Sequence, residues 1–234
     1  MSENFDGPAQ SAATLTWTDD TSISGWYVHK SADPAGPITQ YRVTSSGSST
    51  GIRLYLWRNS SSSTDFSLGS KPATDTGAMM MGMRISNNTG QTLTSFTIGY
   101  TGEQWYKSTA TQNNQLVLAY QISPSNDADD GWVDGAWTEV DDMRFNSPKE
   151  DGVAASIDGN DAENRVVLAP KTVTGISWGP GEDIWLRWFD SNSSGVDQGL
   201  AVDDISFTAN IPEPASMSVL VSTMMLAMNR GSRR

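Results

Sequence analysis

The sequence predicts an all-β fold: an antiparallel, two-sheet, jelly-roll-like sandwich followed by a C-terminal hydrophobic helix. Apolar residues alternate with period two in several segments, which is the pattern of strands with one buried face. Clusters of Gly, Ser, Thr, Asn and Asp separate these segments, and no long stretch of the body has helical periodicity. Short strands at this spacing are typical of two-sheet sandwiches.

Several segments carry the strand pattern. The segment from Ile184 to Phe189 has bulky side chains on both faces, and its two tryptophans are expected to pack within the sandwich. In the last segment, Leu200 and Val202 are expected to oppose Ile205 and Phe207. The segments are 79–85, 96–100, 116–122, 184–189 and 200–207, and turn-forming residues lie between them at 88–90, 125–131, 157–164 and 191–199.

Composition excludes several classes of function. The chain has 234 residues and a net charge of −12, so it would repel the phosphates of a nucleic acid. It has no cysteine, which excludes disulfides, thiolate zinc sites and cysteine nucleophiles. His29 is the only histidine, so a multi-histidine metal site is excluded and a Ser-His-Asp triad would have to use it. We expect His29 to be an ordinary surface or half-buried side chain.

The C-terminal tail, residues 210–234, is distinct from a sandwich body of residues 1–209. It has no charge within its apolar run, which suits a helix, and basic residues at its end are expected to stay in the cytoplasm. At about 1.5 Å per residue the run is shorter than the roughly 30 Å of hydrocarbon in a bilayer, so we expect a temporary anchor. In order, the tail contains Pro212, Glu213 and Pro214, the run from Ala215 to Met228, and Arg230, Arg233 and Arg234.

This tail resembles the PEP-CTERM sorting signal of Gram-negative bacteria. The resemblance implies export across the inner membrane, recognition and cleavage by an exosortase, and release to the cell surface or the extracellular matrix. The N-terminal segment MSENFDGPAQ contains neither the basic n-region nor the apolar h-region of a signal peptide. We therefore expect an upstream in-frame start that encodes one.

The body resembles a family of bacterial extracellular proteins whose function is not settled, on segments 87–105, 157–165, 182–190 and 199–207. Its two ends are similar to MAM-type and carbohydrate-binding jelly rolls. The similar residues are ENFD, from Glu3 to Asp6, and AVDDI, from Ala201 to Ile205. This second resemblance implies a jelly-roll fold and a structural calcium ion.

The implied calcium site joins the first and last strands, which are neighbours in jelly rolls of this type. Its candidate ligands are Glu3, Asp6, Asp203 and Asp204, because calcium prefers oxygen ligands such as carboxylates. Alternation places Asp203 on the core-facing side of its strand, where an unpaired carboxylate would be costly. In the alternative interpretation, Asp203 caps backbone N–H groups or pairs with Arg187.

Nine tryptophans offer candidate platforms for sugar rings, whose C–H faces stack on aromatic side chains. Trp57, Trp105, Tyr106 and Trp132 lie near turn-forming residues and are the candidate ligand-binding residues. The alternative is that such residues close one end of the sandwich. The acidic loop 126–134 fails the EF-hand register, so we favour a solvated loop over a calcium loop there.

Catalysis is not expected. Glycosidases use two carboxylates, and the strand from Glu139 to Arg144 comes close to the E-x-D-x-x-E pattern of concanavalin-like hydrolases but ends in arginine. Glu103 lies next to Trp105 in sequence, where an acid can have a raised pKa, but we favour a role in ordering the turn.

The sequence therefore predicts an exported, non-enzymatic surface or matrix protein that an exosortase sorts and that recognises polysaccharide. A hydrolase of matrix polysaccharide and a purely structural matrix component stay open as alternatives.

Overall fold

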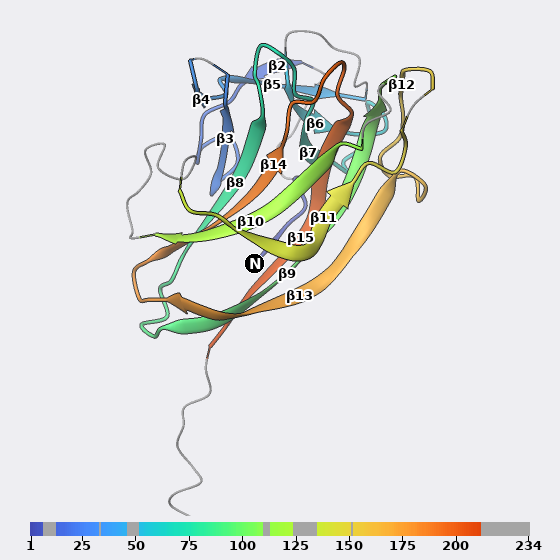
Figure 1. Cartoon of the computed structure of the whole chain (residues 1–234). Helices are drawn as coiled ribbons and strands as arrows, with labels where there is room; N and C mark the ends of the chain where they lie inside the picture. The colour runs from blue at the N-terminus through green and yellow to red at the C-terminus, as the bar shows by residue number, and fades with distance from the viewer. Residues whose placement is uncertain are drawn as a thin grey trace, which may run out of the picture.

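The computed structural model (Figure 1) describes residues 1–6, 13–32, 34–45, 52–109, 113–123, 135–150 and 152–211. Within these ranges the chain forms strands β1 to β15 and no helix, and the strands make two sheets. The predicted all-β, jelly-roll-like sandwich is therefore confirmed. The predicted C-terminal helix lies outside the described residues. No helix long and apolar enough to cross a membrane occurs in the described part of the chain.

The first sheet contains two long strands, β9 and β15, side by side at its centre. Its strands are antiparallel to their neighbours except for β5 and β6, which are parallel. In spatial order they are β12 (Ala155–Ser156), β9 (Leu93–Lys107), β15 (Gly199–Asn210), β7 (Ser67–Ser70), β6 (Leu54–Trp57), β5 (Gln40–Thr44) and β2 (Thr14–Thr16), with β1 (Ser2–Glu3) beside β15 and β13 (Arg165–Trp178) beside β9.

The second sheet is antiparallel throughout its described pairs. Figure 1 shows its strands β10 and β11 crossing in front of β9 and β15, with β14 and β8 following to the left. In spatial order the strands are β11 (Thr138–Asn146), β10 (Gln115–Ser123), β14 (Asp183–Asp190), β8 (Met79–Ser86), β3 (Trp26–Lys30) and β4 (Gly36–Pro37).

The core lies between the sheets and uses the alternating faces that the sequence predicts. Trp188 lies within it, stacked on Trp26 with 5.5 Å between ring centroids and edge-on to Tyr100 at 5.6 Å. Large rings packed in this way supply much of the apolar burial that a protein without disulfides needs. Other core side chains are Met79, Met81 and Met83, Phe96 and Ile98, Leu116 and Leu118, and Ile184 and Leu186.

The last strand departs from its predicted pattern. Regular pairing of β15 with β9 stops at Asp203 and resumes at Ser206, and Asp204 between them has a φ of +49°. Such a β-bulge changes the direction of the side chains that follow it. The apolar side chains of the strand therefore all lie in one core: Leu200, Val202, Ile205 and Phe207. The prediction that they lie on opposite faces is wrong.

The same bulge places Asp203 outside the core. Up to the bulge the strand is regular, so Asp203 shares a face with Ala201. Ala201 packs with Tyr55 and Trp57 in a separate cluster on the outer face of the first sheet. The prediction that Asp203 is on the core-facing side is thus also wrong, and its cause is the bulge.

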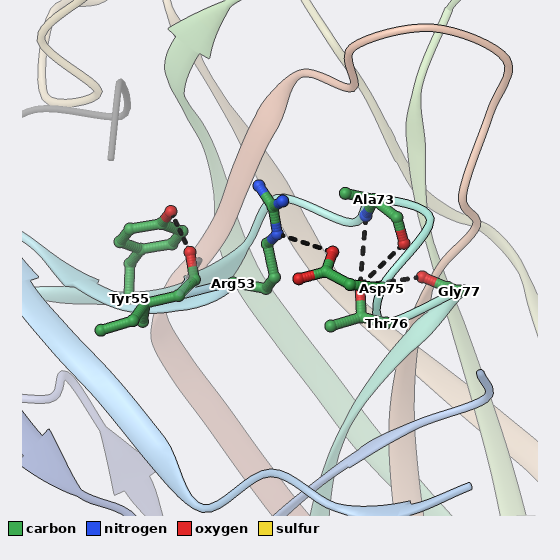
Figure 2. A network of polar contacts seen from close by, with 7 residues as sticks. Arg53, Tyr55, Ala73, Asp75, Thr76 and Gly77 are labelled. Atoms are coloured by element: carbon green, nitrogen blue, oxygen red, sulfur yellow. Dashed lines mark hydrogen bonds and ion pairs between the residues drawn. The ribbon is translucent and has the colours of Figure 1, made fainter. Parts of the chain in front are cut away.

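A tight turn between β7 and β8 carries the chain from the first sheet to the second. Figure 2 shows Thr76 Oγ1 close to backbone groups of Ala73 and Gly77, at 3.1 Å from Ala73 N and 3.3 Å from Gly77 O. In the same view Arg53, just before β6, donates from Nε to Asp75 Oδ1 at 3.1 Å. The ion pair ties the turn back to the first sheet.

Candidate functional site

The outer face of the second sheet has a groove of about 580 Å³. It follows β10, with β11 on one side and β14 on the other (Figure 1). Residues two apart on a strand share a face, so alternate positions line it. They are Asn113, just before β10, with Gln115, Val117 and Ala119 in it; Trp137, just before β11, with Glu139 in it; and Arg187 and Phe189 in β14, with Ser191 just after it.

Small side chains form the floor of this groove and large ones form its walls. Val117 and Ala119 belong to the middle strand, with Phe189 opposite the first and Arg187 opposite the second. The guanidinium carbon of Arg187 lies 4.1 Å from the ring centroid of Trp137 and 5.4 Å from that of Phe189. The groove thus combines aromatic surface with hydrogen-bonding groups, which is the combination that a sugar ring requires.

A second aromatic cluster lies on the same face, towards β3. Tyr27 and Trp185 meet edge-on with 4.7 Å between ring centroids, and Arg84 lies 5.3 Å from the ring of Tyr27. Arg84 also forms an ion pair with Asp20 at 3.3 Å. Burial raises the pKa of Tyr27 to about 12. This cluster is buried, and the partly buried Trp137 and Phe189 of the groove pack against it.

The outer face of the first sheet carries a buried pair of acids. Glu103 of β9 is 1% exposed and Asp203 of β15 is 4% exposed. Glu103 is directly opposite Ala201, so the two carboxyl groups share one face of neighbouring strands. Burial raises the pKa of Glu103 to about 7, although Trp105 Nε1 donates a hydrogen bond to its carboxylate at 2.9 Å. Burial, and then the charge of Glu103, raise the pKa of Asp203 to about 9.

The first and last strands are neighbours, as the calcium prediction requires. β1 pairs with β15, with Glu3 opposite Ile205. Each of the predicted ligands has its own local contact, however, and Asp6 Oδ1 accepts from Phe66 N at 3.0 Å. Among the described residues, no group of three or more His, Cys, Asp or Glu side chains is placed to hold a metal ion.

The other predicted calcium ligands contact backbone or hydroxyl groups. Glu3 Oε1 accepts from Phe5 N at 2.8 Å, and Asp203 Oδ1 accepts from Asp204 N at 2.7 Å. The exposed Asp204 lies 3.5 Å from Thr101 Oγ1. The backbone-capping alternative for Asp203 is therefore present. Its alternative pairing with Arg187 is excluded, because the two residues lie on the outer faces of different sheets.

Two of the predicted sugar platforms are buried. Trp57 is 0% exposed and Trp105 is 1% exposed. Their rings stack at 6.4 Å between centroids, and Tyr55 stacks on Trp57 at 4.6 Å. A ring without an exposed face has no surface for a sugar, so this prediction is corrected for both. Packing of three rings on each other against the sheet accounts for their burial.

The remaining predicted platforms differ from each other. Tyr106 is partly exposed, but the ammonium group of Lys71 lies 4.2 Å from the centroid of its ring. Burial lowers the pKa of Lys71 to about 8. Trp132 lies outside the described residues. The three predicted platforms that the structure describes, Trp57, Trp105 and Tyr106, therefore do not form an open site.

The residues considered for catalysis also have structural partners. His29 is buried, contrary to our expectation, with Nε2 3.1 Å from Asp19 Oδ2. Arg144, which breaks the hydrolase pattern, forms an ion pair with Glu139 at 2.8 Å. Glu139 is also the one acid in the described lining of the groove.

Sequence reasoning missed Trp137 and Phe189 as groove residues. For Phe189 a signal was present, because the segment 184–189 has large side chains on both faces and one face must therefore be outside the main core. Trp137 follows a turn-rich stretch and lies just before β11. Its place beside Arg187 depends on the order of three strands, which its local sequence does not encode.

The chain matches no protein-family model and no curated protein. It is similar in structure to the K3 cleaved adhesin domain of Lys-gingipain from Porphyromonas gingivalis W83, at 14% identity over 85% of this chain and all of that one, with a TM-score of 0.39. It is also similar to a carbohydrate-binding module that recognises mannan, at 7% identity over 86% of this chain and 97% of that one, with a TM-score of 0.37.

A third similar structure is a carbohydrate-binding module in complex with β-1,4-galactotriose. The identity is 6%, over 64% of this chain and 74% of that one, with a TM-score of 0.33. Similarities at this level do not identify a ligand or an activity for this chain.

The buried acid Glu103 predicts a pH-dependent stability when metal ions are chelated. Its pKa is 4.5 in the unfolded reference and about 7 in the folded protein, so the folded state holds a proton that the unfolded state has lost between these values. The free energy of unfolding should therefore fall as the pH rises from about 4.5 to 7. In Glu103→Gln the free energy of unfolding should fall less steeply with pH, by up to about 1.4 kcal/mol per pH unit. Urea denaturation at several pH values measures this slope.

The amide of this variant can still accept the hydrogen bond from Trp105, so packing is preserved. Glu163→Gln removes an exposed acid that pairs with Lys149 and serves as the control, for which no change of slope is expected. Equal slopes for the wild-type chain and Glu103→Gln would show that Glu103 is ionised in the folded protein.

Proposed function

We propose that this protein is an exported, non-enzymatic component of the cell surface or extracellular matrix that binds polysaccharide in the groove over β10. The observation that carries the proposal is the arrangement of Trp137, Arg187 and Phe189 around a floor of small side chains. Aromatic rings provide stacking surface for the C–H faces of pyranose rings. The neighbouring amide, hydroxyl and guanidinium groups provide hydrogen bonds to sugar hydroxyls.

The lining also supports binding without hydrolysis. Glycoside hydrolysis needs two carboxyl groups on either side of the scissile bond, and Glu139 is the one acid in the described lining. Its partner Arg144 holds it in an ion pair. The buried acids Glu103 and Asp203 lie on the other sheet, away from the groove.

Trp137→Ala tests the position of the binding site. It should weaken binding of the full chain to polysaccharides on a glycan panel by about tenfold or more, because it removes one wall of the groove. Tyr106→Ala changes the partly exposed predicted platform on the first sheet and should leave binding unchanged. Isothermal titration of both variants measures the difference.

The opposite order of effects would move the binding site to the first sheet. Absence of binding to every glycan would favour the purely structural alternative. Release of reducing sugar by the wild-type chain, abolished in Glu139→Gln, would establish the hydrolase alternative instead.

We also propose a structural calcium ion near the first and last strands. Two buried carboxyl groups with raised pKa values, Glu103 and Asp203, are what a nearby cation would stabilise in their charged form. Asp6, Asp204 and Glu3 lie on neighbouring segments, and backbone carbonyl oxygens and water would complete the six to eight ligands of about 2.3–2.6 Å that calcium takes. The ion would also link β1 to β15.

Calcium should raise the melting temperature of the chain relative to chelator. At a free calcium concentration 100-fold above Kd, the free energy of unfolding rises by about 2.7 kcal/mol. The effect should grow with pH, because the ion must displace the proton that Asp203 holds up to a pKa of about 9. Asp203→Asn should erase it, while Asp75→Asn, in the β7–β8 turn, should keep it. Identical melting curves with millimolar calcium and with chelator would refute this site.

We further propose that an exosortase recognises Pro212, Glu213 and Pro214 and cleaves the chain near them, after the run from Ala215 to Met228 has held it at the inner membrane. The motif, the run and the terminal arginines occur in the order that sorting requires.

Intact-mass analysis of protein released from the surface of the native host tests this proposal. The released chain should lack Arg230, Arg233 and Arg234. Replacing Pro212 and Pro214 with alanine should leave the tail attached and the protein in the membrane fraction. Recovery of released protein with its tail complete would count against sorting.

A further inference from the structure

We infer that the groove over β10 takes the end of a glycan chain and not an internal segment. This inference rests on the proposed glycan binding at the same groove and specifies which part of the glycan enters it. The contact between Arg187 and Trp137 carries it, because that contact closes the groove at one end.

The two side chains meet above the floor of the groove. In the sheet β10 lies between β11 and β14, so Trp137 and Arg187 come from opposite sides of it. A guanidinium carbon 4.1 Å from the indole centroid must therefore lie over β10. Ala119, opposite Arg187 in the register, is 2% exposed, whereas Val117 on the same face is partly exposed. The floor is thus covered at Ala119 and open at Val117.

Beyond the contact between Arg187 and Trp137, which we call the bridge, Gln121 is partly exposed but backbone lies against its side chain. Gln121 is the next residue on the same face of β10, and a Cβ at Gly135 would collide with its side-chain amide. The backbone that leads into β11 therefore lies directly on the floor there. At the other end of the groove, Asn113 and Ser191 are exposed. Among the residues that the structure describes, side chains and backbone close one end of the groove and the other end is exposed.

A groove of this shape restricts how a polymer can bind. An internal segment must enter at one end and leave at the other, which the bridge prevents. A terminal sugar unit can lie over Val117 against the bridge, while the rest of the chain leaves past Asn113 and Ser191.

Stoichiometry distinguishes the two modes of binding. We would titrate the full chain with short and long size fractions of neutral β-1,4-mannan and β-1,4-glucan by isothermal calorimetry. Recognition of chain ends predicts a constant number of protein molecules per glycan chain as chain length increases. A number that rises in proportion to chain length would overturn the inference and leave the proposed function intact. Absence of binding to all fractions would overturn both.

Variants test whether the contact between Arg187 and Trp137 restricts binding to the ends of glycan chains. Arg187→Ala should open the groove and make the number of protein molecules bound per long chain increase with chain length. Arg84→Ala is the matched control, because Arg84 lies against Tyr27 and Trp185 on the same face but outside the groove. It should keep the constant stoichiometry.

Two safeguards keep the test decisive. Thermal melting must show that Arg187→Ala is folded, and if it is not, Trp137→Phe shortens the other half of the bridge and should have the same effect. Chemical blocking of both ends of the short mannan and glucan fractions needs no variant, and it should abolish their binding to the wild-type chain. Undiminished binding of end-blocked chains would overturn the inference.

Discussion

The β-bulge in the last strand determines how both faces of the first sheet are used. A regular strand would place Asp203 on the same side as Ile205 and Phe207, so either a carboxylate would enter the core or two large apolar side chains would leave it. Burying an uncompensated charge costs several kcal/mol. The left-handed conformation of Asp204 costs of order 1 kcal/mol, and Asp is among the residues that tolerate it best. The bulge therefore keeps Ile205 and Phe207 in the core, and it places Asp203, which stays 4% exposed, beside Glu103 on the outer face.

Strand β14 of the second sheet meets a similar problem, and its pairing with β10 and β8 has no bulge. β14 has large side chains on both faces, and only Ile184, Leu186 and Trp188 face the main core. Trp185 gains burial by packing with Tyr27 and Met80, while Arg187 and Phe189 stay partly exposed over the narrow strand β10. The groove is the consequence of large residues on β14 and β11 beside small ones on β10. Its geometry follows from strand order as much as from residue type.

The sequence predicted the strands well because period-two alternation is a local property. The apolar faces of β8, β9, β10 and β14 follow directly from it, and so does the fold class. The sequence did not reveal the bulge in β15. Leu200 and Val202 alternate regularly, and so do Ile205 and Phe207, so only the pairing with β9 shows the irregularity between them. Trp57 and Trp105 were assigned to the surface because turn-forming residues lie near them. Their burial depends on the stack of Trp57 on Trp105, which brings together β6 and β9, two strands far apart in the sequence.

The acid pair and the groove lie on opposite outer faces of the sandwich, with the whole core between them. Interiors of this kind are close-packed, and side chains that share no partner contribute almost independently to stability. A cation or a proton at Glu103 and Asp203 therefore acts on how firmly β15 and its neighbours are held. A cation or proton bound there does not contact Val117, Arg187 or Trp137, so it does not directly change the shape of the groove. In the functions proposed above, stability is therefore tuned through one outer face, while glycan binding uses the uncharged floor on the other.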